Sequence, residues 1–341
     1  MNIPSLSPLS PATALRIEAP RRLSFGMRDC LKAFHSWFRA FKRTHMIEPG
    51  LYYTGERYDI AAPLLVTCNY HLTVLSLWRC LRGRNVRILV IDTDGINVWC
   101  SSGKGRFSAA AIMQQVARYG KGMLTRGEKI DLILPKLSLS GVKLSDLRKQ
   151  GVRPVVGPVY ASALPAFLDG TASRDTAADI FWFSLKDRLF TLTPSLVQFA
   201  KYFIWAAAGL FLWDLLFPTG IHWQVVPAAL GYGLAYILLF PLLPTKKFAV
   251  KGIALFAIVW AASSAWVLFQ GTESLASEPY RYLFGTFFVF GTALFFSLYY
   301  TGNSGVSNYS LVKREIITWL PVSALSYAAA VVSIILAGVM S

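Results

Sequence analysis

A cysteine lies in the middle of a short tract that joins an apolar run to a helical pattern. The tract reads Asn97-Val98-Trp99-Cys100-Ser101-Ser102-Gly103-Lys104. A cysteine between a strand and a helix is expected near the carboxyl edge of an α/β sheet, where open sheets bind their ligands. A neighbouring helix end and the charge of Lys104 both favour the thiolate form of Cys100. Such a thiolate could bind a soft metal or attack an electrophile.

Short apolar runs alternate with helical patterns on both sides of this tract. The predicted strands are Leu64–Thr67, Val86–Ile91, Asp131–Pro135 and Val155–Tyr160. The predicted helices are Leu72–Leu81, Ser108–Tyr119, Lys143–Gln150, Ala163–Leu168 and Ala177–Leu185. Strands and helices that alternate in this way predict an α/β domain with a mostly parallel sheet and right-handed crossovers.

Charge is distributed unevenly along the 341 residues. The chain is 54% hydrophobic and only 15% charged, which is too apolar for an ordinary soluble protein. Residues 1–195 contain 27 of the 34 Lys and Arg and 14 of the 18 Asp and Glu. The composition therefore predicts a water-soluble half followed by a membrane half.

Five long apolar segments follow residue 195, and each could cross a hydrocarbon core of ~30 Å as a helix. They are Phe199–Phe217, Gln224–Leu243, Phe248–Phe269, Tyr280–Tyr300 and Ile316–Met340. Short connectors and tryptophans towards the segment ends favour membrane helices over buried core helices of a soluble domain. We therefore expect an all-α transmembrane domain of five helices.

The loops between these segments predict an orientation. Loops that contain Lys246, Lys247, Lys313 and Arg314 alternate with loops that have almost no Lys or Arg. The positive-inside rule then places the N-terminal domain in the cytoplasm and Ser341 outside. We expect a multi-pass protein of the cytoplasmic (inner) membrane.

The first 44 residues are predicted to be a separate region. Residues 1–25 lack the apolar core of an export signal and are interpreted as a flexible tail. Residues 27–44 place apolar side chains opposite basic ones at helical spacing, which predicts a basic amphipathic helix. This helix could lie on an anionic leaflet, on a partner or on its own domain. The predicted regions are then 1–44, 45–195 and 196–341.

The cysteines and histidines exclude several kinds of site. The four cysteines form no Cys-x-x-Cys pair, so the spacing of an iron–sulfur or zinc site is absent. A cytoplasmic domain also argues against structural disulfides. We interpret Cys30 and Cys80 as small core residues and Cys68 as structural, with a site-lining role as its alternative. His71 is the only histidine near a predicted strand end and is expected at the surface.

A phosphate-binding loop is also excluded. Gly103-Lys104 has Val98 where the motif needs a glycine, and Gly105 follows where it needs Ser or Thr. The chain contains no Gly-x-Gly-x-x-Gly fingerprint either. No nucleic-acid partner is expected.

The tract from Asn97 to Gly105 closely resembles the signature of the HgcA family, the corrinoid proteins of microbial mercury methylation. That signature is Asn-(Val/Ile)-Trp-Cys-Ala-(Ala/Ser)-Gly-Lys. The resemblance covers about residues 45–315 and includes a cytoplasmic cobalamin-binding domain followed by membrane helices. The other similar segments are Glu48-Pro49-Gly50-Leu51-Tyr52, Asn69-Tyr70, Leu132-Ile133-Leu134-Pro135-Lys136-Leu137, Gly157-Pro158-Val159 and the stretch from Tyr300 to Glu315.

The resemblance implies a Rossmann-like corrinoid-binding domain, related to the corrinoid iron–sulfur protein of the acetyl-CoA pathway. A cobalamin-type cofactor would be bound by residues 97–104, with Cys100 as the lower axial thiolate ligand of cobalt. A strongly donating thiolate favours transfer of the methyl group from methyl-Co(III) corrinoid to Hg(II), giving methylmercury. Asn97 could donate to the sulfur or shape its turn. Gly103 would let the backbone approach the ring, and Trp99 could pack on the ring edge or in the core.

The resemblance also implies partners. The family uses a small ferredoxin-like reductant with two 4Fe–4S clusters (HgcB type), and this chain has no iron–sulfur spacing of its own. Methyl groups would arrive from a donor of the methyl-folate pathway. The basic excess of residues 1–195 suits an acidic carrier, although a solvated surface explains the same charge.

This chain departs from the family pattern at several positions. Ser101 replaces the usual alanine, and a hydroxyl beside the sulfur could donate to it and weaken its electron donation. Arg106-Phe107-Ser108-Ala109 and Ser138-Leu139-Ser140-Gly141-Val142 also differ from the family. The alternative function is therefore a corrinoid-binding membrane paralogue with another methyl acceptor or no methyl-transfer activity. A transporter is less compatible, because the spans lack buried charge pairs.

Overall fold

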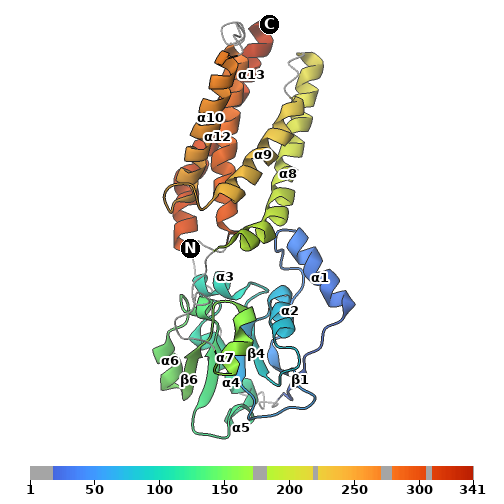
Figure 1. Ribbon diagram of the computed structural model, residues 1–341, viewed down its shortest axis with the longest axis vertical. Helices are drawn as coiled ribbons and strands as arrows, with labels where there is room; N and C mark the ends of the chain where they lie inside the picture. The colour runs from blue at the N-terminus through green and yellow to red at the C-terminus, as the bar shows by residue number, and fades with distance from the viewer. Residues whose placement is uncertain (1–17, 172–182, 218–221, 270–278, 305–308, 341) are drawn as a thin grey trace, which may run out of the picture. The chain divides into compact units, whose positions relative to one another are not determined.

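The computed structural model of the chain describes residues 18–171, 183–217, 222–269, 279–304 and 309–340 (Figure 1). It divides into two compact units. The first unit comprises residues 1–33 and 43–180, and the second comprises residues 34–42 and 181–341. The boundary near residue 180 precedes the one expected at 195, because a continuous helix already begins at Leu185.

A mixed six-stranded sheet forms the centre of the first unit, in the order β1-β2-β4-β3-β5-β6. β2 runs antiparallel to β4, and the other neighbouring strands pair in parallel. The strands are β1 (Arg21–Arg22), β2 (Gly50–Tyr53), β3 (Leu64–Cys68), β4 (Arg87–Ile91), β5 (Ile130–Leu134) and β6 (Val152–Val156). The predicted α/β class is confirmed, whereas the sheet is mixed because of β2.

The two central strands, β3 and β4, are buried along their whole length. Successive side chains of a strand point to opposite faces of the sheet, and here they join two different hydrophobic clusters. Val66, Cys68, Leu89 and Ile91 belong to one cluster, while Leu65, Ile88 and Val90 belong to the other. Continuous apolar runs are typical of strands that are covered on both faces, which is why the sequence predicted β3 and β4 to within about one residue.

Helices cover both faces of the sheet. Residues of α3 (Val98–Gly103), α4 (Ala109–Tyr119) and α6 (Leu144–Lys149) join the first cluster. Residues of α2 (His71–Cys80) and α7 (Leu164–Leu168) pack in the second. The shorter elements are α5 (Lys121–Leu124), η1 (Lys136–Ser138) and η2 (Ala161–Ala163). Predicted helices 72–81, 108–119, 143–150 and 163–168 are therefore present, and the helix expected over 177–185 lies mostly outside the described residues.

Two expectations for the sheet were wrong. The last strand is β6, Val152–Val156, which begins three residues before the predicted Val155–Tyr160. The end of the predicted flexible tail pairs with the sheet, because β1 lies parallel to Tyr52 and Tyr53 and the Leu23 amide donates to the Tyr53 carbonyl at 2.8 Å. β1 and β2 are short edge strands whose pairing depends on residues distant in the sequence.

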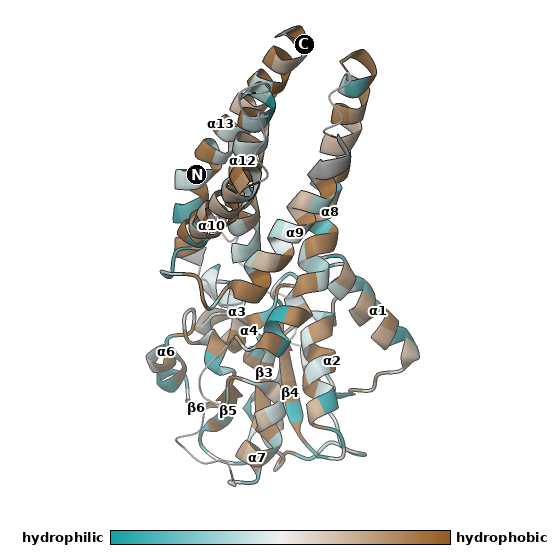
Figure 2. Ribbon diagram, turned by 45° about the horizontal axis from the view of Figure 1, so that its top comes forward, coloured by the Kyte–Doolittle hydropathy of each residue, from teal (hydrophilic) through white to brown (hydrophobic). Residues whose placement is uncertain are grey.

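The second unit is helical, and brown apolar positions dominate its long helices in Figure 2. Its helices are α8 (Leu185–Leu216), α9 (His222–Leu239), α10 (Phe248–Phe269), α12 (Pro279–Thr301) and α13 (Tyr309–Met340). In the described part of the chain, four helices are long and apolar enough to cross a membrane: α8, α10, α12 and α13. Within α9, the described apolar helix Val226–Leu239 is shorter than these four, so the predicted fifth span is not confirmed.

Buried charges join three helices at one end of the second unit. Glu315 of α13 accepts hydrogen bonds from the amides of Phe248 and Ala249, both at 2.8 Å, and so caps the start of α10. Lys251 donates to the carbonyls of Phe240 and Leu243 at 2.7 and 2.6 Å, just beyond α9. Each charge therefore satisfies backbone groups that a helix end leaves without intrahelical partners.

Candidate functional site

The cysteine tract forms helix α3, which begins directly after the carboxyl end of β4. Among the parallel strands the order β4-β3-β5-β6 reverses direction between β3 and β5. Open α/β sheets bind ligands at the carboxyl edge beside such a reversal. η1, which follows β5, packs against α3 at this edge. The predicted tract therefore lies at the part of the sheet where ligand binding is most expected.

Asn69, the residue after β3, organises the loop between β4 and α3. Its side-chain oxygen accepts from the amides of Thr93 and Gly95 at 3.1 and 3.0 Å and lies 2.9 Å from the Thr93 hydroxyl. Its amide nitrogen donates to Asp92 at 3.1 Å. Asn69 and Thr93 are both buried, so this network fixes the loop from within the protein. Sequence reasoning assigned Asn69 only to the family resemblance and missed this positioning role.

Asn97 caps the first turn of α3. Its side-chain oxygen accepts a hydrogen bond from the Cys100 amide at 2.9 Å, in the geometry of a helix N-cap. This contact supports shaping of the turn as a role for Asn97, and a hydrogen bond between its side chain and the Cys100 thiol supports the other role considered for it. The cap fixes the backbone at the cysteine itself.

The two serines of the tract direct their hydroxyls into their own helix. Ser101 Oγ donates to the Asn97 carbonyl at 2.6 Å and lies 3.0 Å from the Val98 carbonyl. Ser102 Oγ donates to the Val98 carbonyl at 2.8 Å. Both side chains are buried. The Ser101 proton therefore has a backbone acceptor, which differs from the expectation that it could donate to the sulfur.

The other side of α3 is more accessible. Trp99 and Cys100 are half-buried, Gly103 and Lys104 are exposed, and Val98 is buried in the core. The side chain of Cys100 is thus neither sealed in the core nor fully solvated. The backbone at Gly103, which has no side chain, is exposed close to the cysteine. The half-burial of Trp99 fits either of the two roles considered for it.

The electrostatic surroundings of Cys100 act in opposite directions. Burial raises the pKa of the Cys100 thiol, whereas Lys104, a hydrogen bond with Asn97 and Arg43 lower that pKa. The net direction is upward from the usual value. The effect expected of Lys104 is present, but burial outweighs it. A metal that binds this sulfur would have to displace its proton.

Arg43 reaches the site from a distant part of the sequence. The segment after it crosses the carboxyl end of β3, where the Ile47 amide donates to the Asn69 carbonyl at 2.9 Å. Arg43 and Arg106 lie 3.5 and 3.4 Å from the same carboxylate oxygen of Asp94. The sequence placed Arg43 on an amphipathic helix, but α1 ends at Phe38. Arg43 instead adds positive charge near Cys100.

Gly141 allows the segment after η1 to approach α3. A side-chain carbon at this position would lie 2.5 Å from the Ser102 carbonyl oxygen and 2.9 Å from that of Phe107. Only glycine fits between these backbone oxygens without displacing them. Gly141 is therefore a positioning residue for the cysteine tract. The residues around it in the sequence did not predict this role.

Other candidate ligands are not gathered at this site. Cys68 is fully buried, burial raises its pKa, and it packs in the first cluster, in keeping with a structural role. Arg79 donates to Cys30 Sγ at 3.1 Å, and Cys80 is partly buried on α2. The expected surface position of His71 is wrong, because its side chain is 2% exposed and its Nε2 lies 3.2 Å from Asp29 Oδ1.

No group of three or more His, Cys, Asp or Glu side chains that could hold a metal ion occurs among the residues that the structure describes. This finding has no bearing on a corrinoid, whose macrocycle supplies most of the cobalt ligands. A single soft protein ligand is enough. A half-buried cysteine on a capped turn, with exposed glycine beside it and two nearby cations, fits that requirement.

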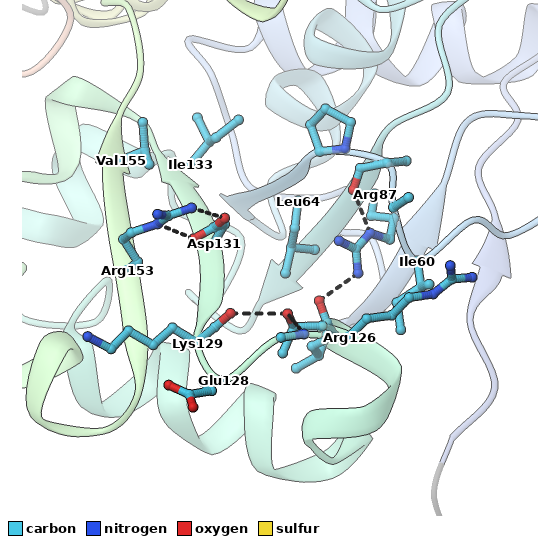
Figure 3. Close-up of a pocket in the computed structure, with 16 residues that line it drawn as sticks. Ile60, Leu64, Arg87, Arg126, Glu128, Lys129, Asp131, Ile133, Arg153 and Val155 are labelled. Atoms are coloured by element: carbon cyan, nitrogen blue, oxygen red, sulfur yellow. Dashed lines mark hydrogen bonds and ion pairs between the residues drawn. The ribbon is translucent and has the colours of Figure 1, made fainter.

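A cavity of ≈ 880 Å³ lies at the opposite edge of the sheet (Figure 3). Its lining includes Leu64 and Arg87, the first residues of β3 and β4. Arg87 is bound to the carbonyls of Ala62 and Leu124, both at 2.8 Å, and Arg153 pairs with Asp131. None of residues 97–104 lines this cavity. It is therefore separate from the cysteine site.

Comparison with models of protein families and with curated proteins found no match to this chain.

Proposed function

We propose that this protein is a membrane-anchored corrinoid-dependent methyltransferase whose methyl acceptor is Hg(II), with methylmercury as the product. The observation that carries the proposal is the position of Cys100. Its capped turn lies at the carboxyl edge of the sheet beside the reversal of strand order, and its sulfur is partly accessible. The resemblance of the tract to the HgcA signature supplies the cofactor and the reaction.

The residues around Cys100 have separate roles in this proposal. A bound corrinoid would supply a cobalt-held methyl group that can leave with its bonding electrons towards a soft electrophile. Cys100 would hold the cobalt through its sulfur and donate electron density to it. Lys104 and Arg43 would offset the burial that raises the pKa of this thiol. Asn97 and Gly141 would hold the turn in place.

The contacts of Ser101 bear on the choice of acceptor. A hydroxyl bonded to the sulfur would withdraw electron density and disfavour transfer to Hg(II). The Ser101 hydroxyl is instead 2.6 Å from the Asn97 carbonyl, its backbone acceptor. Replacement of the family's alanine by serine therefore does not remove the basis for mercury as acceptor. The serine stays compatible with a strongly donating sulfur.

The partners in this proposal follow the same resemblance. A ferredoxin-like protein with two 4Fe–4S clusters would return cobalt to its reduced state, and a methyl-folate donor would reload it. Electron transfer needs only a transient contact, which complementary charge can steer. The excess of Lys and Arg in residues 1–195 supports an acidic partner surface.

The proposed location is the cytoplasmic membrane, with the first unit in the cytoplasm. Four apolar helices support membrane insertion. The basic residues Lys246, Lys247, Lys313 and Arg314 support this orientation through the positive-inside rule. If α9 crosses as well, Ser341 lies outside.

Methylmercury formation tests the proposal. Purified protein would be loaded with methylcobalamin, supplied with a low-potential reductant and given Hg(II). We expect wild type to form methylmercury, Cys100→Ala to form none above the protein-free background, and Cys80→Ala to match wild type.

The alternative is a corrinoid-binding paralogue with another acceptor or no methyl transfer. It predicts Cys100-dependent corrinoid binding without methylmercury. That result would contradict mercury methylation and keep the cofactor assignment. If wild type showed neither Cys100-dependent corrinoid binding nor methylmercury formation, the whole proposal would be contradicted.

A further inference from the structure

Helix α1 (Met27–Phe38) exposes a narrow stripe of large apolar side chains. Met27 is 78% exposed, Leu31 61%, Phe34 58% and Phe38 41%. At about 100° per residue, these four positions fall within about 60° of the helix circumference. Figure 2 shows this helix with brown apolar and teal polar positions alternating along it. A continuous exposed stripe of this kind marks an interaction surface.

The rest of the circumference of α1 is either basic and exposed or in contact with protein. Arg28, Lys32 and Arg39 are exposed and lie next to the stripe on one side. The remaining side contacts protein: Asp29 is 3.2 Å from His71 Nε2, Cys30 accepts from Arg79, and Ser36 is fully buried. The helix thus has an apolar stripe, a basic flank and a protein-facing side, in that order around its axis.

The last residues of α1, from Phe34 on, belong to the second unit and contact its first apolar helix. Trp37 Nε1 donates to the Phe190 carbonyl at 2.8 Å, and the rings of Trp37 and Phe41 lie 5.9 and 5.7 Å from the ring of Phe190. Phe190 belongs to the first turns of α8, where Leu185 and Leu189 are also exposed. The part of the stripe that belongs to the second unit, Phe34 and Phe38, therefore lies on the same turns as Trp37, which contacts the start of a helix that is apolar enough to cross a membrane.

We propose that α1 is an interfacial helix whose apolar stripe inserts into the headgroup region of an anionic bilayer, beside the start of α8. A helix with one narrow apolar stripe and a basic flank is suited to this position, because the stripe enters the acyl boundary while Lys and Arg meet anionic headgroups. Because α1 contacts α8, a helix that could cross a membrane, we expect lipid rather than a second protein chain against the apolar stripe. The inference does not depend on corrinoid chemistry.

Site-specific fluorescence tests the position of the stripe. The full-length chain, with its native cysteines replaced by alanine, would carry an environment-sensitive probe at Leu31→Cys, or at Arg28→Cys as the matched control on the basic flank. Each protein would be placed in phosphatidylcholine nanodiscs with and without phosphatidylserine. We expect lipid-borne spin labels to quench the Leu31 probe several-fold more than the Arg28 probe, and more strongly with phosphatidylserine.

Two results would overturn the inference. Equal quenching at both positions would mean that the stripe is outside the bilayer. A Leu31 probe that is shielded in detergent, with shielding that grows with protein concentration, would identify a second copy of the chain as the occupant.

Hydrogen exchange of the wild-type chain provides a check without substitutions. Amides of residues 27–38 should exchange more slowly in nanodiscs with phosphatidylserine than in phosphatidylcholine alone. Arg28→Gln combined with Lys32→Gln and Arg39→Gln should abolish that difference. Identical exchange of wild type in both lipids would contradict an anionic interface.

Discussion

Cys100 is subject to two opposing influences, burial and positive charge, and the balance between them determines how easily its proton leaves. Burial in a low-dielectric environment disfavours the thiolate, while Lys104 and Arg43 favour it. The pKa of the thiol is raised, so the thiolate fraction of the free protein increases as the pH rises towards and beyond that pKa. Cobalt ligation should therefore become more favourable with increasing pH.

Removal of the Lys104 charge should raise the pKa of Cys100 further. In Lys104→Gln, alkylation of Cys100 by iodoacetamide should need a higher pH for its half-maximal rate, measured on the Cys100 peptide by mass spectrometry. Arg43→Gln should give a smaller shift in the same direction, because Lys104 has the larger effect. Arg118→Gln is the control and should leave the profile unchanged. A downward shift in Lys104→Gln would contradict this assignment.

Ser101→Ala should leave the sulfur's donation to cobalt unchanged, because the hydroxyl bonds to the backbone. Loss of those hydrogen bonds and the gain in helix propensity should nearly cancel, within about 1 kcal/mol of unfolding free energy. The measurement is the absorption spectrum of the cobalamin-loaded protein, together with its thermal midpoint. A spectrum altered towards stronger thiolate donation would show that the hydroxyl does contact the sulfur.

Residue types and spacing predicted that the cysteine tract lies between a strand and a helix, and they offered shaping of the turn as one of two roles for Asn97, because both depend on a few neighbouring positions. They could not predict the net pKa of Cys100. That value depends on burial by the whole domain and on Arg43, which approaches only because its segment crosses the end of β3. Similarly, the Ser101 hydroxyl could be assigned to a carbonyl only once the helix geometry was known.

At the scale of elements, the position of α3 depends on its contact with the segment after η1. Gly141→Ala should displace α3, because the added carbon would lie 2.5 Å from the Ser102 carbonyl oxygen. We expect destabilisation by about 1–3 kcal/mol, as for other overpacked sites, and weaker cobalamin binding in a spectral titration.

Gly122→Ala is the matched control for this substitution. Apart from its chain neighbours and the backbone of its own helix, short helix α5, no described heavy atom lies within 4 Å of its added carbon. It should bind cobalamin as wild type does. If Gly141→Ala matched it in both measurements, η1 would have no role in positioning the tract.

Helix α10 depends on a partner helix for its cap. Glu315→Ala should remove the acceptor of the Phe248 and Ala249 amides and lower the stability of the second unit by about 2 kcal/mol, measured as a thermal shift in detergent. Glu315→Gln keeps one acceptor oxygen and should lose less. Equal effects of the two variants would indicate that the carboxylate is not acting as a cap.

Elements differed in how well the sequence predicted them. β3 and β4 have continuous apolar runs that are covered on both faces, so their limits were evident. β2 is four residues long and runs antiparallel to β4, and its pairing depends on a long-range contact that no local pattern encodes. The cap that Glu315 provides for α10 joins residues that are likewise distant in sequence.

At the scale of the whole molecule, composition separated a charged half from an apolar half, and the structure contains a sheet unit and a helical unit. The boundary between the two units differs from the one expected at residue 195. The reason is that α8 begins well before its apolar part, with a first turn that contains Lys186 and Arg188. Charged residues become gradually rarer along this helix. A change in composition therefore predicts where the membrane segment begins more accurately than it predicts where the helical unit begins.

The proposed topology predicts which loops can be labelled in intact cells. A membrane-impermeant maleimide should label Glu273→Cys directly, whereas Lys246→Cys should react only after permeabilisation, because basic loops remain inside. Wild type provides the background from native cysteines. The opposite pattern would contradict the orientation and favour α9 as a helix that does not cross.

The central claim is that Cys100 holds the cobalt of a bound corrinoid, and absorption spectroscopy tests it most directly. Purified chain reconstituted with cobalamin should show a thiolate-shifted spectrum, which Cys100→Ala should abolish and Cys80→Ala should retain. If wild type and Cys100→Ala gave the same spectrum, Cys100 would not be the cobalt ligand and the proposed chemistry would have no site.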